Sequence, residues 1–232
     1  MPHYGGTIDL EDSNDPRTRI VNWVPDGSYV LEVGCGSGTI IGHLAHVKAC
    51  RALAVEPDAV MAQEARSTGV EVLQGKVDSP VVRQALVQRA PFDVIIFADV
   101  LEHLADPWQV LRNMGGVLLP DGCILVSLPN VAHWTVRLSL LAGRFEYTDG
   151  FLLDRTHLRF FTLATARRLF VDSGYGIEGM QVRWAPLPGD RLWRRLPLVR
   201  NSVNEWLART VPGLYGYQFV FKLRRGAENR AG

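Results

Sequence analysis

Three glycines at alternate positions follow a short apolar run and indicate a place where the backbone approaches a ligand closely. They are Gly34, Gly36 and Gly38, and Cys35 lies between the first two. Glycine permits tight turns and close contact because it has no side chain. A dinucleotide site would need its third glycine three residues after the second, where Thr39 stands here.

Acids at the ends of successive apolar runs predict what that ligand carries. Glu32 precedes the glycines, where a carboxylate would repel a diphosphate and attract an ammonium group. Glu56, followed by Pro57, ends the next run, from which a carboxylate can accept both hydroxyls of a ribose. Asp78 follows the third run and is placed to accept a hydrogen bond from an adenine amino group. Ammonium, ribose and adenine together predict S-adenosylmethionine.

Histidines farther along the chain are candidates for the reacting end of the site. Methyl transfer from a sulfonium is an in-line displacement, so the protein must align the nucleophile and remove its proton. His157 is the first candidate for a general base and His103 the second, because histidine titrates near neutrality. His133 is expected to contact substrate. Arg155 and Arg159 flank His157 and would share its face of an extended segment, where they could grip an anionic substrate group.

A metal site is an alternative use of the same residues. Asp99, Glu102 and His103 would project to one side at the start of a helix, and His157 could complete a set for Mg²⁺ or Mn²⁺. A metal-free site is the preferred interpretation, with Ala98 and Asp99 assigned to the cofactor.

The elements that position these residues alternate apolar runs with stretches of helical spacing, which is typical of a parallel sheet with crossover helices. The predicted strands are 29–33, 52–56, 70–74, 92–98 and 123–128, and the predicted helices are 39–47, 58–67, 80–88 and 107–117. Asp106 can cap the last helix, and residues 119–122 are expected to turn into the fifth strand.

The pattern changes after residue 129, which predicts a cap formed by residues 129–161. We expect a helix at 131–143, a long loop at 144–161 and a helix at 162–173, then strands 176–184 and 217–224 as an antiparallel pair. Residues 185–216 form an insertion in which arginines alternate with tryptophans and leucines. We interpret it as an amphipathic lid, with contact to single-stranded nucleic acid or to an anionic membrane as alternatives. Residues 1–16 are interpreted as a polar arm or lid.

Length and composition fit one α/β domain covering residues 1–232. The net charge of +1 gives no general signal for a nucleic-acid partner. Cys35, Cys50 and Cys123 have no paired spacing, so they are expected to be reduced thiols. There is no leader pattern and no run of about 18 apolar residues, so we expect a cytoplasmic protein that does not span a membrane. The sequence does not indicate an oligomeric state.

The motifs resemble the class I S-adenosylmethionine-dependent methyltransferases over about residues 22–175. The resemblance rests on the glycine motif EVGCGSG, on Glu56 as the ribose acid and on the motif at 92–104. It implies an enzyme with a Rossmann-like sheet of seven strands in the order 3-2-1-4-5-7-6, the last strand antiparallel, and with helices on both faces.

The resemblance also suggests the acceptor. The segment 153–161 is similar to methyltransferases of polysaccharide and secondary-metabolite pathways, which implies O-methylation of a sugar-derived or natural-product hydroxyl. The Glu102-His103 pair is similar to that of ubiquinone-biosynthesis O-methyltransferases and small-RNA 3′-end methyltransferases, although Asp99 stands where those families tend to have Glu. Alternatives are a metal-dependent RNA 3′-end 2′-O-methyltransferase and a non-catalytic S-adenosylmethionine-binding partner subunit. An NAD-dependent oxidoreductase is disfavoured by Glu32 and Thr39.

Overall fold

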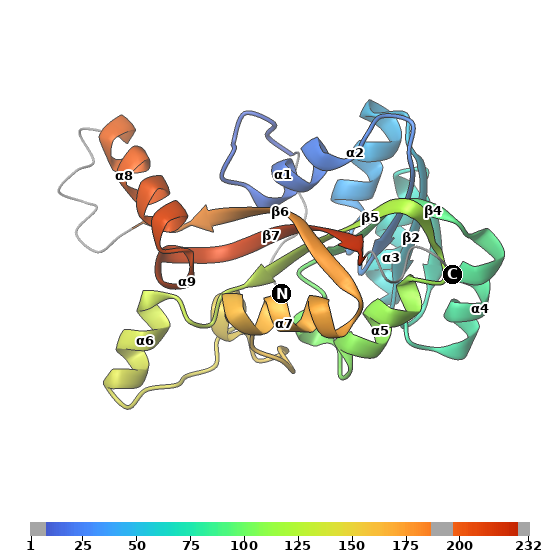
Figure 1. The fold of residues 1–232 in the computed structure, drawn as a ribbon. Coiled ribbons are helices and arrows are strands. Elements are labelled where there is room, and N and C mark those ends of the chain that lie inside the picture. Colours follow the sequence, from blue (N-terminus) through green and yellow to red (C-terminus); the bar gives the residue numbers. More distant parts are fainter. Residues whose placement is uncertain (1–7, 187–196, 227–232) are drawn as a thin grey trace.

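One mixed sheet organises the computed structural model, which describes residues 8–186 and 197–226 (Figure 1). Its order is β3-β2-β1-β4-β5-β7-β6; β7 runs antiparallel to both β5 and β6, and the other neighbouring pairs are parallel. The predicted Rossmann-like order is therefore confirmed. The strands are β1 Tyr29–Val33, β2 Arg51–Glu56, β3 Glu71–Gln74, β4 Phe92–Ala98, β5 Leu118–Pro129, β6 Tyr175–Trp184 and β7 Gly216–Arg225.

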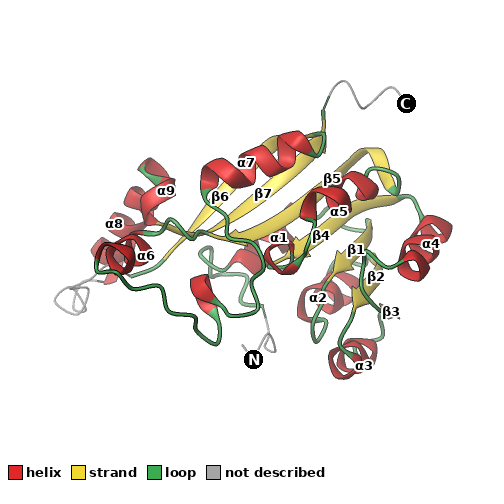
Figure 2. Cartoon of the chain, turned by 90° about the horizontal axis from the view of Figure 1, so that it is seen from below, coloured by secondary structure: helices red, strands yellow, loops and turns green. Residues whose placement is uncertain are grey.

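Helices cover both faces of this sheet (Figure 2). Helices α1, α2 and α3 contribute to one apolar cluster, and α4, α5 and α7 contribute to the other. The helices are α1 Pro16–Trp23, α2 Thr39–Val47, α3 Ala59–Ser67, α4 Pro80–Arg89, α5 Pro107–Met114, α6 Trp134–Leu141, α7 Leu163–Asp172, α8 Pro197–Thr210 and α9 Pro212–Tyr215, with 3₁₀ turns η1 Leu101–His103 and η2 Phe151–Leu153.

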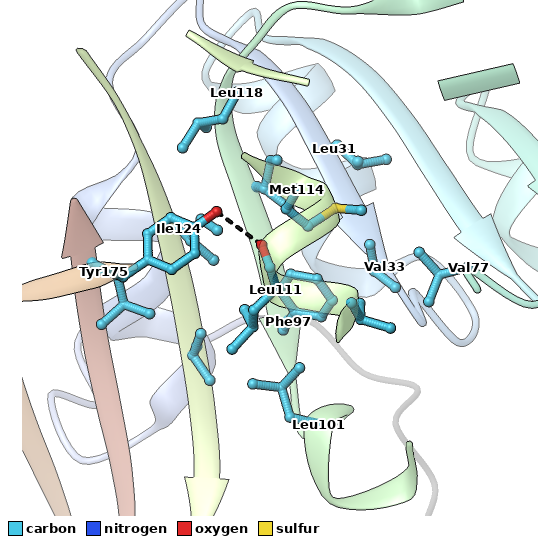
Figure 3. Packing of buried hydrophobic residues seen from close by; sticks show 14 of the residues in the cluster. Leu31, Val33, Val77, Phe97, Leu101, Leu111, Met114, Leu118, Ile124 and Tyr175 are labelled. Atoms are coloured by element: carbon cyan, nitrogen blue, oxygen red, sulfur yellow. Dashed lines mark hydrogen bonds between the residues drawn. The ribbon is translucent and has the colours of Figure 1, made fainter. Parts of the chain in front are cut away.

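The central strands form because their residues are apolar on both faces, as a covered parallel sheet requires. In β4, Phe97 packs in one cluster and Ile96 in the other, and neither is exposed. Figure 3 shows the cluster that includes α4, α5 and α7, in which the Tyr175 hydroxyl donates to the Leu111 carbonyl at 2.9 Å. The predicted cap of α5 is present, since Asp106 accepts from the Gln109 amide at 2.9 Å. A rigid sheet therefore carries the loops that follow its strands.

The N-terminal segment forms turns and then a helix where the structure describes it. Residues 8–15 form successive turns, with the Asp12 amide bonded to the Asp9 carbonyl and the Asp15 amide to the Asp12 carbonyl. Asp15 then caps α1, which was not predicted. Its sequence is mostly polar, so its helical periodicity is weak, yet Ile20 and Val21 are buried against the body of the protein.

The turn predicted at residues 119–122 is wrong, because this segment belongs to β5. Strand β5 pairs with β4 through Leu118, loses register, and pairs again from Cys123 onward. A side chain at Gly122 would lie 2.9 Å from the Asp93 carbonyl oxygen, so the bulge needs glycine there. Proline and glycine thus mark a bulge rather than a chain reversal.

The predicted elements beyond residue 129 are present with shorter helices. Helix α6 falls within 131–143, η2 falls within the predicted loop, and β6 pairs antiparallel with β7 as expected. Helices α8 and α9 occupy the second half of the insertion, while residues 187–196, with Arg191, Trp193, Arg194 and Arg195, lie outside the described residues. Within the described parts of the chain, no helix combines the length and apolar character needed to cross a bilayer.

Candidate functional site

A cavity of about 450 Å³ lies where β1, β2 and β4 end. It is lined by residues from distant parts of the sequence, namely several residues between 12 and 20, Arg183 of β6 and Gln218 of β7. The glycine loop, the ends of β2, β4 and β5, and η1 complete the lining. Of the predicted site residues, the cavity brings together Glu32, Gly34, Cys35, Gly36, Glu56, Ala98, Asp99 and His103.

The glycine loop turns tightly and packs closely on its neighbours, as glycine allows. Gly34 has φ +70°, and a side chain there would meet Val100 at 2.7 Å. Gly38 has φ +84° and does not line the cavity; a side chain on it would lie 3.0 Å from Ala65 of α3. Gly34 and Gly36 therefore form the cavity wall, and Gly38 lets α2 begin close to α3.

Glu32 is a buried carboxyl at the base of the cavity. It is 2% exposed, and its Oε2 accepts from the Ile41 amide at 2.9 Å. Burial raises the pKa of Glu32 to about 8 because the charged form loses its hydration. A ligand ammonium group would favour the ionised form, which agrees with the predicted partner.

Glu56 is oriented by two backbone amides. Its Oε2 accepts from the Gly36 amide at 2.8 Å and its Oε1 from the Asp58 amide at 2.9 Å. The glycine loop and the segment after β2 therefore fix the orientation of this carboxylate. The neighbouring Pro57 is exposed and outside the cavity. Asp78 is also exposed and does not line the cavity, so the structure does not bring it to the other cofactor candidates.

Asp99 is held between the end of β4 and the two strands beyond it. Its Oδ1 accepts from the Ser127 hydroxyl at 2.8 Å and from the Gln218 amide, while its own amide donates to Ser127 at 3.0 Å. Burial raises the pKa of Asp99 against these hydrogen bonds. These bonds direct Asp99 toward the cavity, and it is not part of the histidine cluster described next.

A cluster of Glu102, His103 and His157 reaches the cavity through His103. The two imidazole rings are 4.8 Å apart, and a donor atom from each of the three residues lies within 4.8 Å of the others. His103 lines the cavity, whereas His157 lies behind it. Burial lowers the pKa of His157 and raises that of Glu102 well above its usual value. This donor set could hold a divalent cation.

The three predicted substrate residues lie apart from the cavity. His133 is buried, and its Nδ1 lies 2.8 Å from the Thr135 hydroxyl; burial lowers the pKa of His133 to about 4. Arg155 pairs with Asp149 at 2.8 Å. Arg159 donates to the Ala105 carbonyl at 2.6 Å. Both arginines thus hold the cap loop in this structure.

Several cavity residues, from the N-terminal segment and from β6 and β7, were not among the predicted site residues. Arg17 lines the cavity, oriented by Asp15, with Nη2 and Oδ2 2.6 Å apart. Asn14 bonds twice to the Trp184 backbone, donating to its carbonyl at 3.1 Å and accepting from its amide at 3.0 Å. The Asp-Pro pair at positions 15 and 16 is a helix-start signal that could have located α1. No sequence signal places Arg183 or Gln218 beside it.

Comparisons with known proteins agree with this fold. Residues 14–165 match the family model described as methionine biosynthesis protein MetW. Ubiquinone biosynthesis O-methyltransferase of Actinobacillus pleuropneumoniae serotype 5b is 30% identical over 136 residues, which are 56% of this chain and 57% of that protein. The enzyme of the same name from Aeromonas salmonicida is 27% identical over 77% of this chain and 80% of its own length. The chain thus spans little more than half of the first of these relatives.

Solved structures share the fold at low sequence identity. A SAM-dependent methyltransferase from Archaeoglobus fulgidus superposes with a TM-score of 0.60 and 15% identity, covering 94% of this chain and 95% of that one. A methyltransferase in complex with the Haloferax volcanii Trm112 activator gives 0.59 and 15%, covering 93% and 92%. Together with the family match, they confirm the resemblance to the class I methyltransferases, enzymes that use S-adenosylmethionine.

Proposed function

The chain belongs to the MetW family and to the class I S-adenosylmethionine-dependent methyltransferases, and on this premise we propose that it methylates a hydroxyl group of a small molecule. The observation that carries the proposal is one cavity lined by the glycine loop, Glu32 and Glu56 and also by His103. Such a cavity can hold a methyl donor and its acceptor in line.

The charge of the cavity favours a cationic donor. Five carboxyl groups line it, against two arginines and one histidine. S-adenosylmethionine carries a sulfonium and an ammonium group against a single carboxylate, so it complements an acidic cavity. Glu32 is assigned to the ammonium group, Glu56 to the ribose hydroxyls, and Gly34 and Gly36 to close backbone contact with the ligand.

The acceptor is assigned to the end of the cavity at His103. The acceptor oxygen attacks the methyl carbon, the bond from that carbon to sulfur breaks, and the sulfur leaves as the neutral thioether of S-adenosylhomocysteine. The hydroxyl proton must be lost in the same process. We assign acceptance of this proton to the histidine pair, with His103 in contact with the acceptor and His157 behind it.

The acceptor is proposed to be a sugar-derived or natural-product hydroxyl. Transfer to oxygen is supported by relatives whose names specify O-methyltransferases. Ubiquinone-type precursors, which the same names mention, belong in the same screen. RNA is a weaker candidate, since the net charge is +1 and acidic residues outnumber basic residues in the lining of the cavity.

A non-catalytic role as a partner subunit is the second candidate. It is favoured by the description of the family, which names a biosynthesis protein and no reaction. In that case the protein would bind S-adenosylmethionine without consuming it.

Calorimetric titration with S-adenosylmethionine and S-adenosylhomocysteine, followed by a donor-consumption screen over sugar, polyketide, quinone-precursor and RNA acceptors, tests the proposal. Binding with turnover on a small-molecule hydroxyl supports it. Binding without turnover on any acceptor favours the partner subunit. Absence of binding to both ligands would overturn both.

A further inference from the structure

We infer that Arg183 binds an anionic group of the methyl acceptor, so that the preferred acceptor carries a carboxylate or a phosphate in addition to the hydroxyl that is methylated. The inference rests on the proposed function and narrows its substrate class. Arg183 stands near the end of β6 and lines the cavity. Arg155 and Arg159, from which such a grip was expected, instead hold the cap loop.

Arg183 differs from the other arginine of the cavity in having no carboxylate partner in the part of the chain that the structure describes. Arg17, by contrast, pairs with Asp15 at 2.6 Å. The guanidinium of Arg183 donates to the neutral side chain of Gln218 at 3.3 Å. A guanidinium carries several N–H donors, so this bond leaves others for a bound anion. Arginine is suited to carboxylates and phosphates because it can donate to two of their oxygens at once.

Two neighbours on β7 hold this guanidinium in place. Its Nη1 donates to Oε1 of Gln218, and its Cζ lies 5.7 Å from the centre of the Tyr217 ring, which is within the range of a cation–π contact. The amide nitrogen of Gln218 in turn donates to Asp99 at the end of β4. A side chain that is positioned before its ligand arrives loses less conformational freedom on binding.

The strand order associates Arg183 with the acceptor and not with the cofactor. Strand β6 is an edge strand, and β7, β5 and β4 separate it from β1, which carries Glu32. Neighbouring strands lie about 4.8 Å apart, so β6 is roughly 19 Å from β1. Glu56 belongs to β2, which is one strand farther away. The acids assigned to the cofactor therefore come from the opposite half of the sheet.

A second arginine without an ion pair adds positive charge near Arg183. Arg19 of α1 has its Nη1 buried with no hydrogen-bond partner among the residues of known position. Burial lowers the pKa of Arg19, and the positive charges of Arg209 and Arg183 act in the same direction. Glu205 acts in the opposite direction but is paired with Arg209 at 2.6 Å. Arg19 does not line the cavity, so it would attract an anion from a distance while Arg183 makes the contact.

Calorimetric titration of the protein saturated with S-adenosylhomocysteine, using benzoate, inorganic phosphate and benzamide, tests the anion site before the acceptor is known. We expect benzoate or phosphate to bind at least about 10-fold more tightly than neutral benzamide, and the tighter anion identifies the group. Arg183→Gln should weaken anion binding about 10-fold, and Arg183→Lys, which keeps the charge, by less. Arg19→Gln, which removes a more distant charge, should weaken it about threefold. Arg83→Gln changes an exposed arginine of α4 outside the cavity and should bind anions like the parent.

Failure of both anions to bind, or equal binding by the parent and a folded Arg183→Gln protein, would overturn the inference. Affinity for S-adenosylmethionine, measured on every variant, reports that the fold is intact and should be the same in Arg183→Gln as in the parent. If it fell as far as the affinity for the anion, Arg183 would serve the carboxylate of the cofactor, which would also overturn the inference.

Turnover measures the same preference on acceptors that differ only in charge or nearly so. The pairs are protocatechuate and its amide, glucuronate and glucose, and glycerol phosphate and glycerol. In a pair that is methylated, the anionic member should have a kcat/KM at least about 10-fold higher, and Arg183→Gln should remove this advantage mainly through KM. Equal turnover of both members by the parent would overturn the inference and leave the proposed methyl transfer standing. Anion binding that depends on Arg183, without turnover of any acceptor, would contradict the proposed function instead.

Discussion

Glu32 places a carboxyl in the cavity with one amide as its hydrogen-bond donor and no ion-pair partner among the described residues. Because its pKa is about 8, the free protein holds it mostly protonated at pH 7. An ammonium group favours the ionised form. Cofactor binding is therefore linked to loss of a proton from this residue.

We predict that affinity for S-adenosylmethionine falls as the pH is lowered from 8 to 6, by up to about tenfold per unit. The direction follows from the raised pKa, because below it the carboxyl must first be deprotonated at a free-energy cost. Calorimetry in two buffers with different ionisation heats measures the proton released. In Glu32→Gln this release should be lost, while titration of the cofactor's own amino group continues. Equal proton release by both proteins would contradict the assignment.

The histidine pair gives the second prediction at this scale. His157→Ala and His103→Ala should each bind S-adenosylmethionine like the parent but lower turnover about 100-fold, because only the acceptor end is affected. Turnover and cofactor affinity are measured separately, and His46→Ala is the matched control. If His157→Ala kept full turnover, its assigned role in activation would be wrong.

The residues of the site were predictable to different extents. Glu32, Glu56 and the cavity glycines stand beside apolar runs, so their positions at strand ends follow from the chain itself. His103 and His157 could be identified as chemically useful, but their contact depends on how the cap loop packs on η1. Arg17 and Arg183 could not be found together, because only the complete sheet brings β6 to the start of the chain.

At the scale of elements, the glycine loop depends on close packing between two helices. Gly38→Ala should lower the free energy of unfolding by about 1–3 kcal/mol, because its φ of +84° disfavours a side chain and Ala65 lies 3.0 Å from the added carbon. Thermal or denaturant unfolding measures the loss. Gly176→Ala is the control, since nothing lies within 4 Å of a side chain there. Equal stability of the two variants would show that α3 can yield.

The tie between the N-terminal segment and β6 is a second element-level feature. Asn14→Ala removes two hydrogen bonds to Trp184, each contributing about 0.5–1.5 kcal/mol, and should weaken S-adenosylmethionine binding about 10-fold by loosening the cavity wall. Calorimetry or dissociation kinetics measures the change. Asn22→Ala alters an exposed residue of the adjoining helix α1 and should have no effect. Unchanged affinity in Asn14→Ala would mean that the wall does not retain the cofactor.

Some elements could be predicted from the sequence and others could not. Strand β4 is apolar on both faces, so its bounds could be read from the sequence. Helix α1 is short and mostly polar, and its stability depends on its cap and on burial of Ile20 and Val21. The bulge in β5 looks like a turn locally, and only its pairing with β4 identifies it.

For the whole molecule, ligand binding should appear as stability. At a free S-adenosylmethionine concentration 100 times the Kd, the folded state gains about 2.7 kcal/mol. For a domain of this size that corresponds to a rise in Tm of roughly 5–10 °C. Thermal denaturation with and without cofactor measures it, and Glu56→Ala at the same concentration should shift less. A shift equal to that of the parent would argue against Glu56 as a ligand residue.

The origin of the cavity walls determines when the cavity can form during synthesis of the protein. Strand β6 pairs only with β7 among the described strands, and β7 must enter between β5 and β6 after the six other strands have been synthesised. Arg183 and Gln218 reach the cavity only then. The glycine loop and both acids are synthesised long before a pocket exists around them. Cofactor present in the cell can therefore stabilise the finished protein but cannot guide the early folding of the nascent chain.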